Sequence, residues 1–521
     1  MFQPRGSTWD GLPREIRLLI LKCLMQDGCK LGPLATVSRE WQTEIERHNF
    51  SRLRLTPSRL FNFNAMIQRN QALVKYIWFC LELDDYDCTT CAPNRGNLTE
   101  EEYGEAFEIS DTDKCPITTG FQDLFSILST WNRYNNDLTL DISIYSPSDS
   151  QHWFKYLTFM PDVPLDTPGD YYPEKIILNR DYHDPQHGWV AGFRHSATPS
   201  SAILKVFHSV MEVGPFDSNQ SEFQWWDQLP SVPAVTSLLL RQQSRRRWKP
   251  ASLARIFARF PRLQAVYYEP WREWDSMKRL TDRSYQHLFE SIPRCNGSLK
   301  RLVVFENFNQ QYPATMQRFQ WGEDLSQCDS IRNPNPAVSQ MVALASLKLE
   351  HLAASFIADA SYFFQINPTW EWPNLTSLVL TSKLLTPDEN PTKTGAMLRA
   401  AAAAAMKMPR LEIMEIWNGR KGLAALFRYQ VFHHIQQAEI VWKGTWRFIM
   451  ETSIIQAWEA VMSQYDGWKL ELVQEQLDGA AIESHGDALH YLKLSSQAIR
   501  PISLQQIRME QKALEGVETI Q

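Results

Sequence analysis

The spacing of apolar residues predicts a strand unit that recurs along the second half of the chain. From about residue 230, apolar residues fall at offsets 0, 3 and 5, usually just after a Pro or Gly, and helix-like segments separate most of these sets. A strand, helix, strand order at roughly constant spacing predicts parallel strands joined by right-handed crossovers. The sets are Val235/Leu238/Leu240, Leu263/Val266/Tyr268, Leu299/Leu302/Val304, Leu349/Leu352/Ala354, Leu375/Leu378/Leu380 and Leu411/Met414/Ile416.

Two α/β architectures satisfy this order, namely a doubly wound sheet and a leucine-rich-repeat-like solenoid. The repeated offsets favour the irregular solenoid with parallel strands, because each unit would then place equivalent residues inside. Nearer the N-terminus, a strand is predicted over Val74–Leu83, and alternation of apolar residues predicts another at Leu138 to Ile144. A further short strand is expected at Lys175–Leu178 and a final helix at Ser503–Glu515.

The first fifty residues predict amphipathic helices with more apolar surface than so short a segment can bury alone. One helix follows Pro13, which suits a first helical turn, and a Gly-Pro break at Gly32-Pro33 precedes the next. A partner or a neighbouring domain must therefore cover the apolar stripes. These stripes are Leu12, Ile16, Leu19, Ile20, Cys23 and Leu24 on the first helix, and Leu34, Val37, Trp41 and Ile45 on the second.

These helices resemble an F-box, the module that docks on the Skp-type adaptor of cullin ubiquitin ligases. The matching features are the Leu12-Pro13 start and the run Val37-Ser38-Arg39-Glu40-Trp41, within residues 9–55. The link carries Cys29 and Lys30 where the family often has an acidic turn and a leucine. The resemblance implies a three-helix module whose adaptor-binding residues are Leu12, Pro13, Ile16, Ile20, Leu34, Val37 and Trp41.

The layout after this module resembles the leucine-rich-like regions that follow F-boxes in many filamentous-fungal proteins. It implies a substrate-recognition subunit that binds the adaptor, reaches a cullin scaffold through it, and presents a protein substrate to catalytic subunits. The chain itself would not be an enzyme. Two alternatives stay open: a scaffold whose helical module packs internally, and an enzyme with an unrecognised site.

The sequence divides into four regions. We expect the F-box-like module at 1–58, the first part of the repeat region at 59–229, the substrate-binding region at 230–480 and a helical tail at 481–521. The second region includes an acidic loop at 82–113 and a Pro-rich insertion at 146–188.

Target binding is expected on the exposed face of the strands, because neighbours of inward residues point the other way. This row mixes aromatic residues and Arg, which dominate interface hot spots. The alternative is that loops or the tail cover it as a second core face. The candidates are Arg241, Tyr267, Arg301, Phe305, Glu415 and Trp417.

Charge and hydropathy exclude several classes of partner. The net charge of −6 provides no overall basic field for nucleic acid, and the five basic residues between Arg241 and Lys249 read as an exposed turn. The lack of an apolar signal region or an 18-residue apolar run predicts an intracellular protein, in the cytoplasm or nucleus, without a membrane partner. Eight cysteines fit a reducing compartment.

The cysteine spacing allows one metal hypothesis. Cys88 and Cys91 form a CxxC pair with Cys80 before it and Cys115 after it, and four thiolates can hold tetrahedral zinc. Ordinary thiols are the favoured interpretation, because a second short pair is missing. His183 and His187 are expected in a surface loop. No P-loop, nucleophile elbow or HExxH motif occurs, so the sequence nominates no catalytic residue and no cofactor.

Overall fold

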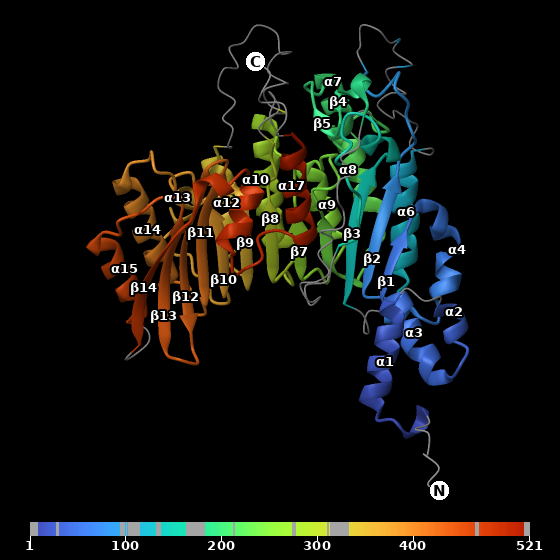
Figure 1. Cartoon of the computed structure of the whole chain (residues 1–521), viewed down its shortest axis with the longest axis horizontal. Helices are drawn as coiled ribbons and strands as arrows, with labels where there is room; N and C mark the ends of the chain where they lie inside the picture. Colours follow the sequence, from blue (N-terminus) through green and yellow to red (C-terminus); the bar gives the residue numbers. More distant parts are fainter. Residues whose placement is uncertain are drawn as a thin grey trace.

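The computed structural model describes residues 9–27, 31–93, 99, 102, 115–131, 137–162, 183–211, 214–273, 278–309, 312, 333–463 and 468–514. The fold is mixed α/β, with a 12-stranded sheet whose strand order follows the chain (Figure 1). The strands are β1 Arg52–Leu55, β2 Tyr76–Glu82, β3 Leu138–Tyr145, β6 Val235–Leu240, β7 Ala265–Tyr268, β8 Arg301–Phe305, β9 His351–Asp359, β10 Ser377–Thr381, β11 Ile413–Arg420, β12 Leu423–Phe432, β13 Gln437–Gly444 and β14 Lys469–Gln476.

Helices precede the sheet, connect its strands and follow it. The N-terminal group is α1 Arg14–Gln26, α2 Leu31–Leu34 and α3 Arg39–Ser51. The connecting helices are α4 Pro57–Ile67, α6 Pro116–Ser129, α7 Ser200–Phe207, α8 Asn219–Gln228, α9 Pro250–Ala258, α10 Lys278–Cys295, α12 Pro336–Ala345, α13 Ala360–Phe363, α14 Pro391–Ala405 and α15 Thr452–Met462. The C-terminal helices are α16 His485–Leu492 and α17 Pro501–Leu514, and a separate hairpin pairs β4 Trp189–Val190 with β5 Phe193–Arg194.

The predicted strand unit is confirmed at all six sets. Strands β6 to β11 pair in parallel, and the offset-3 residues lie opposite one another across the sheet. This ladder runs Leu238, Val266, Leu302, Leu352, Leu378 and Met414, and all of its members are buried in one cluster with side chains from the connecting helices. The recurring spacing therefore exists because each strand turns the same position toward the helices.

The sheet order differs from that of a doubly wound sheet. A doubly wound sheet reverses its strand order and carries connecting helices on both faces. Here the order does not reverse, and buried residues of α4, α6, α9, α10, α12, α14 and α15 all belong to the cluster on one face. In α14, Ala401, Ala402 and Ala405 are buried, because small side chains let the helix approach closely.

The expectation of parallel strands is wrong for part of the region 230–480. Strands β11, β12 and β13 form an antiparallel meander, and β14 then pairs in parallel with β13. Arg420 lies opposite Leu423, so two residues form the first turn, and Gly422 takes a φ of +73° there. A left-handed φ at this position suits glycine, and a tight turn forces antiparallel pairing.

Several segments predicted from the sequence lie wholly or partly outside the described residues. The strand expected at Lys175–Leu178 lies outside the described residues, as does most of the acidic loop 82–113 and the middle of the Pro-rich insertion 146–188. Among the described residues, no helix is long and apolar enough to cross a membrane.

Candidate functional site

The N-terminal helices pack on one another through a small aromatic and ionic core. The rings of Trp9 and Trp41 lie 5.1 Å apart, and Trp9 Nε1 donates to Glu40 Oε2 at 3.1 Å. Arg17 reaches the other oxygen of Glu40 at 3.2 Å. Leu21 of α1 and Ile45 of α3 are buried. Because α3 ends at Ser51 and β1 begins at Arg52, the helices are attached directly to the first edge of the sheet (Figure 1).

An apolar stripe on these helices faces away from that core. Ile16, Leu19 and Ile20 of α1 are 42%, 56% and 37% exposed, and Val37 before α3 is 61% exposed. Positions 16, 19 and 20 share one helical face, because residues three and four apart are neighbours on a helix. Of the other expected adaptor-binding residues, Pro13 is exposed, whereas Leu12, Leu34 and Trp41 are half-buried. We call Ile16, Leu19, Ile20 and Val37 the exposed stripe.

The expectation that the strand row faces solvent is wrong. Phe305, Glu415 and Trp417 are fully buried, Arg241 and Tyr267 are also buried, and Arg301 is half-buried. Tyr267, Phe305 and Trp417 belong to a second apolar cluster, which also includes Ala488 and Leu492 of α16 and Ile507 of α17. Figure 1 shows α17 lying across the middle of the sheet, on the face that the connecting helices leave open. Residues 485–514, which form α16, α17 and the link between them, thus cover the strands, and we call them the cover.

Buried carboxylates attach this cover to the strands. Glu415 on β11 accepts hydrogen bonds from the backbone N–H groups of Ser495 and Ser496 at 2.8 and 3.0 Å, and Arg428 Nε lies 2.7 Å from the same carboxylate. Glu269, after β7, accepts from the backbone N–H of Arg500 at 2.9 Å. Burial raises the pKa of Glu269, while hydrogen bonds to its carboxylate oppose that rise. The carboxylates of Glu415 and Glu269 therefore have structural partners in the cover.

The basic turn is likewise buried and paired. Arg245 Nη2 lies 2.5 Å from Glu510 Oε2 on α17, and Arg247 forms an ion pair with Glu273. Arg241 Nη2 lies 2.7 Å from Asp141 Oδ2 on β3. Burial alone would lower the pKa of Arg241, and the charge of Asp141 reverses that effect and raises it. The expectation of an exposed basic turn is wrong, because acidic residues distant in sequence neutralise it.

The cover contains a histidine that should make stability depend on pH. His485 is buried beside Phe308, its Nε2 is 2.9 Å from Asn307 Oδ1, and burial lowers its pKa from 6.5 to about 3. In this window the unfolded chain binds a proton that the folded chain does not, so stability is full above pH 6.5 and falls as the pH drops toward 3. The loss should be about 1.4 kcal/mol per pH unit. Urea unfolding of the wild type and of His485→Gln at pH 7.0, 6.0 and 5.0 measures it, and equal slopes for the two proteins would contradict the assignment.

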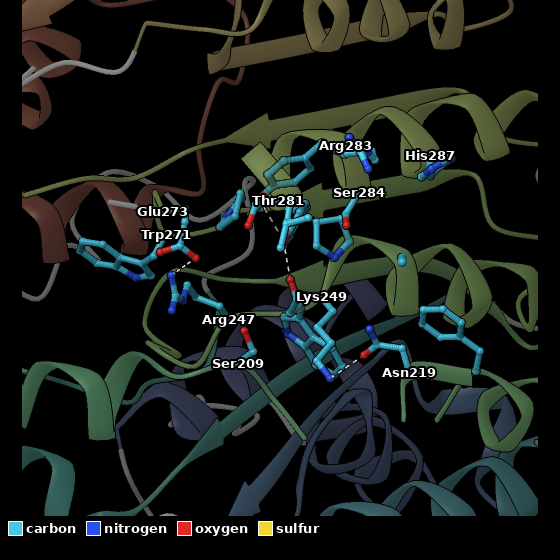
Figure 2. Close-up of a pocket in the computed structure, with 18 residues that line it drawn as sticks. Ser209, Asn219, Arg247, Lys249, Trp271, Glu273, Thr281, Arg283, Ser284 and His287 are labelled. Atoms are coloured by element: carbon cyan, nitrogen blue, oxygen red, sulfur yellow. Dashed lines mark hydrogen bonds and ion pairs between the residues drawn. The ribbon is translucent and has the colours of Figure 1, made fainter. Parts of the chain in front are cut away.

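A pocket with a volume of about 420 Å³ lies at the carboxyl end of β7 (Figure 2). Arg283, Ser284 and His287 line it from α10, while Asn219 and Lys249 come from the starts of α8 and α9. Lys249 Nζ lies 2.9 Å from Glu222. Trp271 and Tyr268 add aromatic walls at the carboxyl end of β7. The mixture suits a polar ligand with an apolar part.

The four cysteines named as a zinc set do not come together as a set. Cys80 is fully buried within β2, and Cys115 is buried at the N-terminus of α6. Cys88 and Cys91 instead lie beside His152 and His187. His187 is buried, so its expected place in a surface loop is wrong. Sequence reasoning missed His152, which follows Cys88 by 64 residues and has no nearby partner in sequence to mark it.

Comparison with known proteins finds a family match for part of the chain. Residues 291–500 match the model of a family of unknown function (DUF6546). This range runs from the end of α10 through α16, so it includes the antiparallel meander and the beginning of the cover. No curated protein matches the chain.

Proposed function

We propose that this protein is the substrate-recognition subunit of a Skp–cullin–F-box ubiquitin ligase. The observation that carries the proposal is the exposed stripe, in which Ile16, Ile20 and Val37 stand at positions where the F-box resemblance expects adaptor contacts. In this proposal α1 to α3 bind the adaptor, the sheet and its helices act as a leucine-rich-repeat-like body, and ubiquitin transfer belongs to other subunits. The chain then needs no catalytic residue of its own.

The stripe supports a docking role because it is costly in a protein without a partner. Full burial of an aliphatic side chain stabilises by about 1.5–3 kcal/mol, and exposed apolar patches of this kind mark interaction surfaces. Arg14 and Glu15 are exposed at the start of the same helix and provide a polar rim. The inner side of α1 already packs on α3 through Leu21, so the stripe is free for a second protein without unfolding the module.

The covered strand row requires a different location for the target. The pocket of Figure 2 is the candidate, because it lies at the carboxyl end of β7, outside the cover. Leu280 is 52% exposed at its rim and offers an apolar contact beside Arg283. The helical module lies beside β1 at the amino-terminal end of the strands, away from this pocket, so adaptor and target would not compete (Figure 1).

The alternative is a scaffold whose helical module serves only its own chain. The Trp9–Trp41 contact and the direct connection of α3 to β1 are compatible with it. The exposure of Ile16, Leu19, Ile20 and Val37 favours the ligase proposal, because internal packing would have buried them.

Co-expression with a Skp-type adaptor tests the proposal directly. We expect the full chain and the adaptor to elute together from size-exclusion chromatography as a one-to-one complex, and a ternary complex to form when the cullin N-terminal domain is added. Separate elution of the chain and the adaptor at micromolar concentrations would favour the scaffold.

A further inference from the structure

Two cysteines and two histidines from three separate segments converge behind the end of β2. Cys88 and Cys91 lie in the loop after β2, His152 follows the turn after β3, and His187 precedes β4. The Nδ1 of His152 and the Nε2 of His187 are 3.3 Å apart. Cys88 Sγ is 3.7 Å from His152 Nδ1, and Cys91 Sγ is 3.5 Å from His187 Nε2. The facing atoms of Cys88, His152 and His187 all lie within 4.8 Å of one another.

The separations His152–His187, Cys88–His152 and Cys91–His187 equal those between ligands of a tetrahedral zinc ion. Cys91 lies outside the group whose facing atoms are all within 4.8 Å of one another, and its thiol donates to the carbonyl oxygen of Cys88 at 3.3 Å, a bond that zinc binding would replace. With bonds of about 2.3 Å to sulfur and about 2.05 Å to nitrogen, two nitrogens lie about 3.3 Å apart and a sulfur lies about 3.6 Å from a nitrogen. A two-residue gap between cysteines also lets one turn supply two sulfur ligands.

The outer hydrogen bonds of the two histidines also favour a metal site. His187 Nδ1 lies 2.8 Å from Asp184 Oδ2, and His152 Nε2 lies 3.2 Å from the carbonyl oxygen of Tyr86. Each of these nitrogens must donate its proton outward, because a carboxylate and a carbonyl only accept. In the neutral rings, the two nitrogens that face each other are then both lone pairs. Such outward bonds to a carboxylate and a backbone carbonyl are typical of zinc-bound histidines.

We infer that Cys88, Cys91, His152 and His187 form a structural Zn²⁺ site of the Cys₂His₂ type. Binding displaces the thiol protons of Cys88 and Cys91 to solvent, because the thiolate is the ligand. Four protein ligands leave no position open for water or substrate, so the role is structural and not catalytic. Cys91, His152 and His187 are buried, which shields the ion, whereas Cys88 lies at the surface.

The site would add a metal link to contacts that already join these segments, such as the bond from Trp189 Nε1 to the carbonyl oxygen of Trp153 at 3.3 Å and the Lys155–Asp184 ion pair at 2.8 Å. The β4–β5 hairpin is not part of the main sheet, and it packs beside α17 of the cover. An ion shared by the loop after β2, the turn after β3 and the segment before β4 fixes that hairpin to the first strands. The inference is independent of adaptor binding.

Metal analysis of the full chain, purified without chelators, tests the site. We expect about one equivalent of zinc in the wild type and in Cys295→Ser, which alters an exposed cysteine far from the cluster. Cys88→Ser with Cys91→Ser, and His152→Asn with His187→Asn, should each retain less than about a tenth of an equivalent. Full zinc content in either double variant would overturn the assignment.

A second measurement on the unaltered protein covers the case in which the variants fail to fold. Removal of zinc with dipicolinate should lower the melting temperature, and one equivalent of Zn²⁺ should restore it. Co²⁺ added to the metal-free protein should give the intense visible absorption of a tetrahedral ion together with sulfur-to-cobalt charge transfer. Failure of the reduced wild type to bind either ion would overturn the inference and leave four ordinary side chains.

Discussion

A variant with Ile16→Asp and Ile20→Asp is expected to lose the adaptor completely in co-purification while the rest of the chain stays folded. Both side chains belong to the exposed stripe of α1 and touch no buried cluster of the described structure. Two aliphatic contacts of about 1.5–3 kcal/mol each are removed, and two carboxylates would have to be desolvated at the interface. Together these terms should weaken binding by at least about a thousandfold.

The matched control uses exposed apolar residues outside the module. Phe61 is 91% exposed on α4, and Ile449 is 79% exposed before α15, so Phe61→Asp with Ile449→Asp introduces the same chemistry elsewhere. This control should bind the adaptor with wild-type affinity in isothermal titration calorimetry. Both double variants should keep the wild-type far-UV circular dichroism spectrum. Adaptor binding that survives in the Ile16/Ile20 variant would remove the ligase proposal.

Trp417→Ala is expected to destabilise the protein by about 3–5 kcal/mol, the range for truncation of a buried large aromatic. Trp417 is fully buried between the sheet and the cover, where its ring lies 5.0 Å from Phe356 and its Nε1 donates to Ser355 Oγ at 3.3 Å. Its removal leaves a cavity and an unpaired hydroxyl. Combined with Tyr267→Ala, it should prevent stable folding instead of selectively removing a target.

Tyr491→Ala provides the comparison, because Tyr491 lies on α16 of the same cover but is 38% exposed. Its effect on the free energy of unfolding should stay near about 0.5 kcal/mol. Urea unfolding followed by far-UV circular dichroism measures both variants. If Trp417→Ala unfolded at the wild-type urea concentration, the cover would not dock on the strands in solution. The strand row would then be exposed and available to bind a target.

The strand positions could be predicted because each unit faces the same helix layer. Leu238, Val266 and Leu302 occupy equivalent register positions, so their spacing along the chain repeats. The meander of β11 to β13 was missed because antiparallel strands follow one another directly, without the helix-like segment on which the repeat assignment depended. The single glycine of its first turn, Gly422, is too weak a signal by itself.

The burial of the second face of the sheet could not be predicted from the strand pattern. Leu239, Tyr267 and Trp417 alternate with the residues that face the connecting helices, and the sequence pattern alone does not show that this second face is also buried. It is buried because α16 and α17 pack on it, and these helices follow more than fifty residues after the last of the six strand sets. A strand pattern records that two faces differ, but it does not record which distant segment covers either one.

Local sequence by itself determined the amphipathic stripe of α1, the parallel strands at the six sets and the class of the fold, because periodicity and turn residues act over a few neighbours. Only the tertiary structure decided which surfaces stay open. It placed α17 over the strand row, paired Arg245 with Glu510 and brought His152 and His187 to Cys88 and Cys91. Each of these contacts joins residues far apart along the chain, where burial and charge pairing fix the arrangement and no local periodicity encodes it.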